Sequence, residues 1–201
     1  DKMKKIFLLF MSVAMAACQT LPTSAEWLAR GDGYFKDGQS QKALAAYNKA
    51  LNINPNNASV YASRGTAYFS TGDYAAAAQD FMKVLEMRPY DVAGYAALAS
   101  VMAAQGYYTD ALEVLNMALV LDRERAETFF SRGGVNFMLG EYDQAVADYS
   151  YVLKLRPAAD VYNARGTVYL KMGDTKSAEE DFAAAKSGRV PDKLSDYILK
   201  N

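Results

Sequence analysis

Residues 58–89 read ASVYASRGTAYFSTGDYAAAAQDFMKVLEMRP and contain the pattern that decides the fold. Gly65 is followed by Gly72 after seven residues, by Ala77 after twelve and by Phe81 after sixteen. The same order of small and large residues recurs along the chain at spacings of 34, 34, 34 and 33 residues, which indicates an internal repeat. The residues that open its five copies are Gly31, Gly65, Ala99, Gly133 and Gly166.

The remaining positions of the pattern stay in phase through all five copies. Each copy predicts two amphipathic helices of about fourteen residues, separated by a glycine. A glycine can take the positive φ that ends a helix, which explains why one stands at each break. The glycines at the breaks are Gly38, Gly72, Gly106, Gly140 and Gly173. The alanines that follow them are Ala43, Ala77, Ala111, Ala145 and Ala178.

Residue size predicts how the two helices of a copy pack. Small residues such as Gly65 and Ala77 let the helices approach, while Tyr68 and Phe81 fill the space between and below them. One helical hairpin cannot bury its own apolar face, so each copy needs a neighbour stacked against it.

These residues resemble the tetratricopeptide repeat family, and the resemblance extends from Ser24 to about Asp192. It implies an all-α superhelix, or solenoid, of five helical hairpins. The expected repeats are residues 24–57, 58–91, 92–125, 126–158 and 159–192. Residues 193–201 carry Leu194, Tyr197 and Ile198 at helical spacing, which predicts a short capping helix.

Arginines stand where the family usually has leucine, and three of them precede an aspartate by sixteen residues. The predicted pairs are Arg64 with Asp80, Arg132 with Asp148 and Arg165 with Asp181. Repeat 3 has Leu98 at the position of the arginine and Val114 at the position of the aspartate, so both charges are absent together. We expect a salt bridge between the two helices of one repeat; the alternative is a solvated charged face.

The composition excludes several classes of function. The chain of 201 residues is 51% apolar, enough for a buried core, and its 22 Lys plus Arg balance 23 Asp plus Glu. A nucleic-acid partner is therefore not favoured. Histidine is absent and Cys18 is the only cysteine, which removes the usual metal ligands and the commonest general base. No Gly-x-Ser-x-Gly or phosphate-loop motif occurs, so we expect no enzyme, cofactor, metal or small-molecule substrate.

Residues 1–17 have the plan of a secretory signal peptide, in which Lys2, Lys4 and Lys5 precede an apolar run from Ile6 to Ala17. At about 1.5 Å per residue the run covers roughly 18 Å, too short for a hydrocarbon core of about 30 Å.

The four residues from Met15 to Cys18 resemble the bacterial lipobox, although leucine is usual where Met15 stands. The resemblance implies that Cys18 is lipidated, that residues 18–23 form a short tether, and that Gln19 favours the outer membrane, at its periplasmic face. Two alternatives remain. Residues 14–16 also form an Ala-x-Ala cleavage site, which would release a soluble periplasmic protein, and a lone cysteine can be a buried structural residue.

The family resemblance also places a partner-binding groove along the first helix of each repeat. The residues expected to contact a partner are Leu28, Phe35, Phe69, Phe130, Phe137, Met138 and Leu170. Repeat 3 offers only small side chains there. The Lys and Asn of a carboxylate clamp are absent, since Leu28 and Asp32 occupy its first pair of positions. Alternatively, Phe35, Phe69 and Phe137 pack between neighbouring repeats.

The function expected from these features is a non-enzymatic scaffold or adaptor of the bacterial envelope. It would bind a helix or peptide segment of envelope proteins and reach the membrane through its lipid anchor. The alternative is a pilotin-like assembly factor for a type IV pilus or secretion channel.

Lipidation can be tested by growing the producing bacterium with a clickable fatty acid. We expect the full chain to take up the label and the Cys18→Ala variant to lose it, because the thiol is the only acceptor that a lipobox provides. Equal labelling of the two proteins would exclude Cys18 as the anchor.

Overall fold

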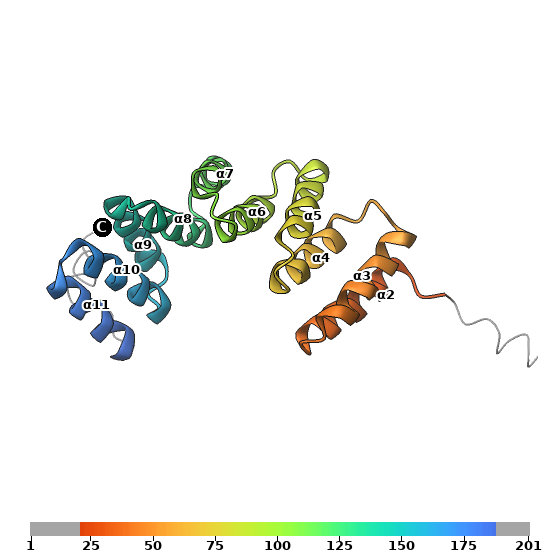
Figure 1. Cartoon of the computed structure of the whole chain (residues 1–201), viewed down its shortest axis with the longest axis horizontal. Coiled ribbons are helices and arrows are strands. Elements are labelled where there is room, and N and C mark those ends of the chain that lie inside the picture. The colour runs from red at the N-terminus through yellow and green to blue at the C-terminus, as the bar shows by residue number, and fades with distance from the viewer. Residues whose placement is uncertain (1–20, 188–201) are drawn as a thin grey trace, which may run out of the picture. The chain divides into compact units, whose positions relative to one another are not determined.

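The computed structural model describes residues 21–187, and every element of regular structure in that range is an α-helix (Figure 1). The ten helices form five consecutive pairs, which confirms the predicted all-α helical-repeat fold. Residues 1–20, with the predicted signal peptide, Cys18 and Gln19, lie outside the described residues. So does the predicted cap at residues 193–201.

The chain divides into two compact units, Asp1–Pro55 and Asn56–Asn201. In its described part the first unit is one pair, α2 (Ser24–Lys36) and α3 (Ser40–Ile53). A capping box opens α2: Glu26 N–H donates to Thr23 Oγ1 over 3.2 Å and Thr23 N–H donates to Glu26 Oε2 over 2.7 Å. This pairing satisfies backbone donors that a helix N-terminus leaves free.

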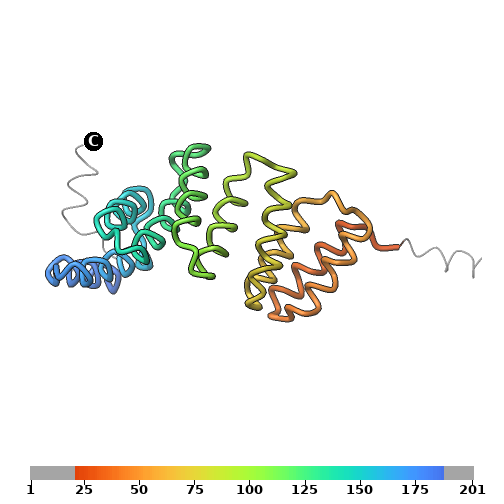
Figure 2. Tube along the Cα trace, turned by 45° about the horizontal axis from the view of Figure 1, so that its top comes forward, coloured from red at the N-terminus to blue at the C-terminus, as the bar shows by residue number. Residues whose placement is uncertain are grey.

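The second unit contains the other four pairs in its described part. These are α4 (Ala58–Ser70) with α5 (Tyr74–Met87), α6 (Val92–Ala104) with α7 (Tyr108–Leu121), α8 (Ala126–Leu139) with α9 (Tyr142–Leu155), and α10 (Ala159–Met172) with α11 (Thr175–Ser187). The second helix of each pair also packs on the first helix of the next pair, so the pairs follow one another in sequence order (Figure 2).

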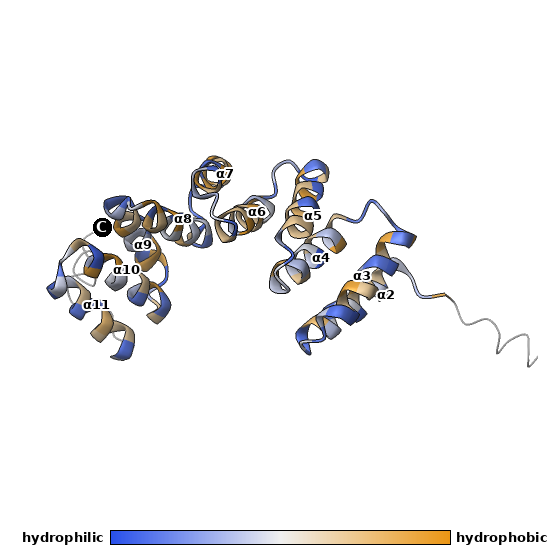
Figure 3. Ribbon diagram, viewed as in Figure 1, coloured by the Kyte–Doolittle hydropathy of each residue, from blue (hydrophilic) through white to orange (hydrophobic). Residues whose placement is uncertain are grey.

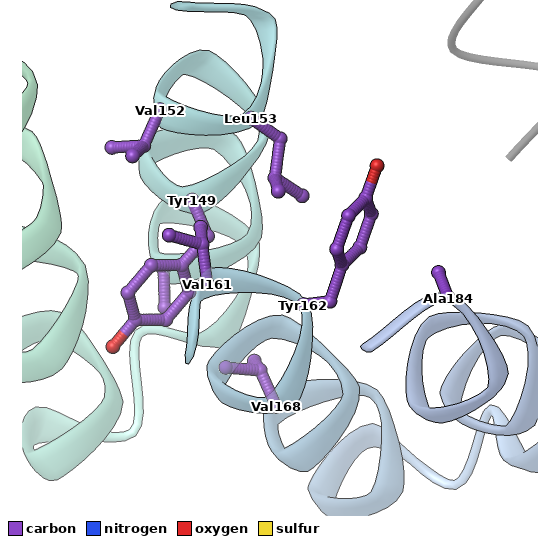
Figure 4. Close-up of a cluster of buried hydrophobic side chains, with 8 residues drawn as sticks. Tyr149, Val152, Leu153, Val161, Tyr162, Val168 and Ala184 are labelled. Atoms are coloured by element: carbon purple, nitrogen blue, oxygen red, sulfur yellow. The ribbon is translucent and has the colours of Figure 1, made fainter. Parts of the chain in front are cut away.

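Each helix of this unit carries both apolar and polar residues (Figure 3), and the apolar ones meet in clusters between pairs. Tyr149, Leu153 and Val161 belong to one such cluster, which joins α9, α10 and α11 (Figure 4). Val152, Leu153 and Val161 are fully buried there. The core therefore runs along the stack, as expected when no pair can bury its apolar face alone.

The predicted turn glycines all take the left-handed conformation, with φ between 73° and 85°. Within residues 21–187 no residue other than glycine has a positive φ. These glycines thus end the first helix of every pair, as predicted.

Glycine is required for a second reason where the two helices of a pair approach. A Cβ added to Gly133 would lie 2.9 Å from Cε1 of Tyr149, and one added to Gly166 would lie 2.9 Å from Cε1 of Phe182. Gly31 and Gly65 are likewise buried against Tyr47 and Phe81. The five alanines of the pattern are all 0% exposed: Ala43, Ala77, Ala111, Ala145 and Ala178.

The three predicted arginine–aspartate pairs are all formed, with two parallel hydrogen bonds in each. Arg165 donates from Nε and Nη2 to the two carboxylate oxygens of Asp181 over 2.8 and 2.7 Å. Arg64 with Asp80, and Arg132 with Asp148, have the same geometry. The aspartates are no more than 4% exposed, so the prediction of a bridge is confirmed and the solvated charged face is not observed.

The bridges also connect one repeat to the next, which the sequence did not indicate. Nη1 of Arg132 donates to Oδ1 of Asn116 on α7 over 2.9 Å, and Nη1 of Arg165 donates to Oγ of Ser150 on α9 over 2.9 Å. Each of these two arginines therefore joins three helices.

Repeats 1 and 3, which lack the aspartate, use other contacts. In repeat 3, Leu98 is 7% exposed and joins Phe81 of the preceding repeat in an apolar cluster. In repeat 1, Arg30 and Lys49 lie over the ring of Trp27, at 4.7 and 4.3 Å from its centroid. Both distances suit cation–π interactions.

Among the residues that the structure describes, no helix combines the length and hydropathy needed to cross a bilayer.

A double-mutant cycle at Arg165 and Asp181 should show strong coupling. Asp181→Leu leaves a guanidinium that is only 13% exposed without its counter-charge, so we expect the free energy of unfolding to fall by about 3 kcal/mol. Arg165→Met should cost a similar amount, and the double variant should lose less than the sum, with a coupling energy above about 1 kcal/mol in urea unfolding.

The control for this cycle is Arg125 with Glu127, an exposed pair whose nearest charged atoms are 3.8 Å apart. Its coupling energy should be close to zero because solvent screens exposed pairs. Additive effects at Arg165 and Asp181 would contradict a stabilising bridge.

Candidate protein-binding site

An apolar pocket of about 400 Å³ opens in the second unit between α6 and α8, with α7 at its base. Its small side chains come from repeat 3, where Ala99, Ser100 and Ala103 face the pocket from α6. Phe130 and Met138 on α8 supply the large ones. The pocket exists because the side chains of α6 are too short to fill the space in front of α8.

Phe130 is held in place from behind by a buried aromatic ring. The ring centroid of Phe130 lies 5.4 Å from that of Tyr149, and the planes of the two rings are tilted by 59°. Tyr149 is 5% exposed. Burial, and after it the charge of Asp148, raises the pKa of Tyr149 to about 12, so the phenol stays neutral at physiological pH. Phe130 therefore presents a supported ring to the pocket.

The pocket lining contains no acidic or basic side chain. Its polar groups are the hydroxyls of Ser100, Tyr108 and Ser131. Met138 is 54% exposed at the rim. Such a surface favours an apolar group with few hydrogen bonds and gives no support for binding an ion. In the described residues no cluster of three potential metal ligands occurs either.

The pocket brings together two of the predicted contact residues, Phe130 and Met138. Phe69 on α4 is 36% exposed and packs on Tyr74, with 5.5 Å between ring centroids. Leu170 on α10 is 49% exposed and lies apart from the pocket lining.

Phe137 is half-buried and packs against the core cluster, with its ring 5.9 Å from that of Tyr142 in the same repeat. Leu28 and Phe35 are half-buried on α2, in the first unit. A partner contact at each predicted position remains a prediction.

Sequence reasoning missed Tyr108 because only the first helix of each repeat was expected to line a groove, whereas Tyr108 begins α7. It also missed Ser131, Gly134 and Val135, which complete the wall on α8. The available signal was the run of small residues on α6 opposite these positions.

The fold defines a helical-repeat protein, with an apolar pocket between α6 and α8. Comparison with known proteins identifies the repeat. Models of the tetratricopeptide repeat match residues 31–72, 58–91, 96–160 and 137–193. The chain belongs to the tetratricopeptide repeat family, and it is accordingly a protein–protein interaction scaffold.

A curated relative, human tetratricopeptide repeat protein 13, is 36% identical over 72 residues, which are 36% of this chain and 8% of that protein. The chain thus matches only a small part of that relative's length.

Solved structures with the same fold have lower identities. A thermophilic repeat protein of Thermus thermophilus has a TM-score of 0.72 at 23% identity over 89% of this chain and 98% of that one. Pseudomonas aeruginosa PilF has a TM-score of 0.73 at 20% identity, over 84% of this chain and 77% of that one. YrrB, described as a repeat protein with an unusual peptide-binding site, has a TM-score of 0.63 at 21% identity, over 94% of this chain and 97% of that one.

Proposed function

We propose that this chain is a non-enzymatic adaptor of the bacterial envelope, which binds a helix or peptide segment of partner proteins through the pocket between α6 and α8. The observation that carries the proposal is the pocket itself. It is an uncharged hollow of about 400 Å³ with a supported aromatic ring, Phe130, on one wall and an exposed Met138 at its rim.

The size of the pocket suits one or two apolar side chains. Its volume lies near the lower end of the range of about 300–1,000 Å³ for small-molecule sites, and its mouth is open to a longer chain. Burial of a single Leu or Phe side chain contributes about 1.5–3 kcal/mol, so one anchor residue can dominate the affinity. A peptide or a helix face presents such anchors at regular intervals.

The groups in the pocket support binding rather than catalysis. The hydroxyls of Ser100, Ser131 and Tyr108 are its only candidate nucleophiles or acids, and the chain has no histidine to activate them. The arginines and aspartates with the most buried charges are already paired in the bridges.

The proposed location is the periplasmic face of the outer membrane, with Cys18 as the lipid anchor; release as a soluble periplasmic protein is the alternative. Support comes from the sequence around Cys18. Thr23, five residues after Cys18, already caps α2, so the tether would be short. The partners in reach would be other envelope proteins.

A pilotin-like assembly factor remains the second candidate, supported by the likeness in fold to PilF. Both functions use the same helical pairs and an apolar anchor. Deletion of the gene separates them: loss of an assembly factor would mislocalise a pilus or secretion channel, whereas loss of an adaptor would change hydrolase activity or cell-wall processing.

The pocket can be tested by removing its side chains and measuring partner capture by crosslinking in intact envelopes. We expect Met138→Ser combined with Phe130→Ser to reduce capture at least about tenfold, because the anchor loses most of its apolar contact. A complementary variant, Ala103→Phe, should block capture by filling the pocket.

The matched control is Met82→Ser on α5, since Met82 is 50% exposed and lies outside the pocket lining. It should capture partners as the parent chain does. Circular dichroism of every variant must show an intact helical fold. Undiminished capture by a folded double variant would refute the proposal.

A further inference from the structure

A second pocket, of about 290 Å³, lies on the other side of α8. Its α8 residues, Arg132 and Asn136, are each two positions from Phe130, Gly134 or Met138 of the first pocket. Two residues turn an α-helix by about 200°, so Arg132 and Phe130 lie on opposite faces of α8. Leu112 on α7 and Gln144, Ala147 and Asp148 on α9 complete most of the lining.

This second pocket stands where other repeats hold a tyrosine ring. Tyr68 and Tyr169 each follow the bridging arginine of their repeat by four residues, and Asn136 follows Arg132 by four. The ring centroid of Tyr68 is 5.8 Å from the guanidinium carbon of Arg64, and that of Tyr169 is 5.7 Å from that of Arg165. Asparagine is much smaller, and the space beside Arg132 is left open.

The exposed fractions of the three bridging arginines agree with the absence of this tyrosine ring in repeat 4. The Arg132 side chain is 26% exposed, against 19% for Arg64 and 13% for Arg165. Phe129 still lies over Arg132, with its centroid at 5.2 Å, but that ring comes from the preceding turn of α8. One side of the guanidinium therefore lacks the aromatic cover that it has in repeats 2 and 5.

The chemistry of the pocket favours a neutral ring over an anion. Arg132 already donates hydrogen bonds from Nε and Nη2 to Asp148 and from Nη1 to Asn116. These bonds occupy the edge of the guanidinium, so a ligand can contact only its flat face. Asp148 and Asn136 are both 4% exposed, and Nδ2 of Asn136 donates to Asp148 Oδ2 over 3.0 Å. The buried carboxylate repels a phosphate, whereas the cationic face attracts the π-electrons of an aromatic ring.

We propose that this pocket binds a tyrosine side chain of a partner protein, in the place that Tyr68 and Tyr169 fill in their own repeats. The ring lies against the guanidinium of Arg132 between Leu112 and Ala147, and Gln144 offers an amide to the phenol hydroxyl. A volume of about 290 Å³ accommodates one such side chain. The site is separate from the pocket between α6 and α8, so it does not depend on the function proposed above.

Repeat 5 shows how such a ring behaves next to the bridge. The pKa of Tyr169 is raised, chiefly by burial, while Arg165 acts in the opposite direction and Asp181, Asp174 and Glu180 add to the increase. The phenol therefore stays protonated beside the carboxylate. A tyrosine bound in repeat 4 would meet the same pairing of arginine and aspartate.

The test uses the full chain labelled with ¹⁵N and titrated with N-acetyl-L-tyrosinamide. We expect saturable shifts of amide signals from α7, α8 and α9, with weaker or no shifts for N-acetyl-L-phosphotyrosinamide. Asn136→Tyr should weaken binding at least about tenfold because it supplies the missing ring from within, and it should raise the midpoint of thermal unfolding by filling the space.

Two further variants separate the outcomes. Ala147→Leu narrows the pocket without touching the bridge and should also abolish the shifts, which covers the case in which Asn136→Tyr does not fold. Phe130→Ser, on the opposite face of α8, should leave them unchanged even if it abolishes partner capture. Absence of saturable shifts, tighter binding of the phosphorylated probe, or undiminished binding by a folded Asn136→Tyr or Ala147→Leu variant would each overturn the proposal.

Discussion

The two helices of a pair approach each other closely, and the packing of the stack follows from this contact. Gly133 and Gly166 leave no room for a Cβ against Tyr149 and Phe182, so the helices meet at the glycine backbone and the rings fill the space alongside. The contact gives each pair a fixed geometry and leaves one apolar face open. In the second unit that face is buried against the next pair, so stacking is needed for stability.

Charged bridges connect the helices of repeats 2, 4 and 5, and an apolar contact replaces the bridge in repeat 3. Arg132 and Arg165 each connect both helices of their own repeat to the preceding one, whereas Leu98 makes the corresponding junction of repeat 3 apolar. A buried pair of charges is a weak source of net stability but fixes orientation, because leaving either partner unpaired is costly. The bridges thus fix how the helices are oriented relative to one another, and the apolar clusters provide most of the stability of the stack.

Departures from the repeat pattern create the two pockets described above. Short side chains on α6 open the apolar pocket in front of Phe130, and an asparagine in place of tyrosine opens the polar one beside Arg132. Regular repeats fill their own space. The two pockets therefore lie where a repeat carries a smaller residue than its neighbours.

The amino-acid pattern alone predicts the helix pairs, the left-handed glycines and the partner of each bridging arginine. Each of these features depends on residues that lie at most about one repeat apart. The same residues recur at the same spacing in several repeats, so each repeat supports the prediction independently. The three-dimensional packing was needed to show that Ser100 and Met138 line one pocket, and that Leu112 and Gln144 line another. A pocket is space that side chains from different repeats fail to fill, and its existence depends on helix positions that no local pattern specifies.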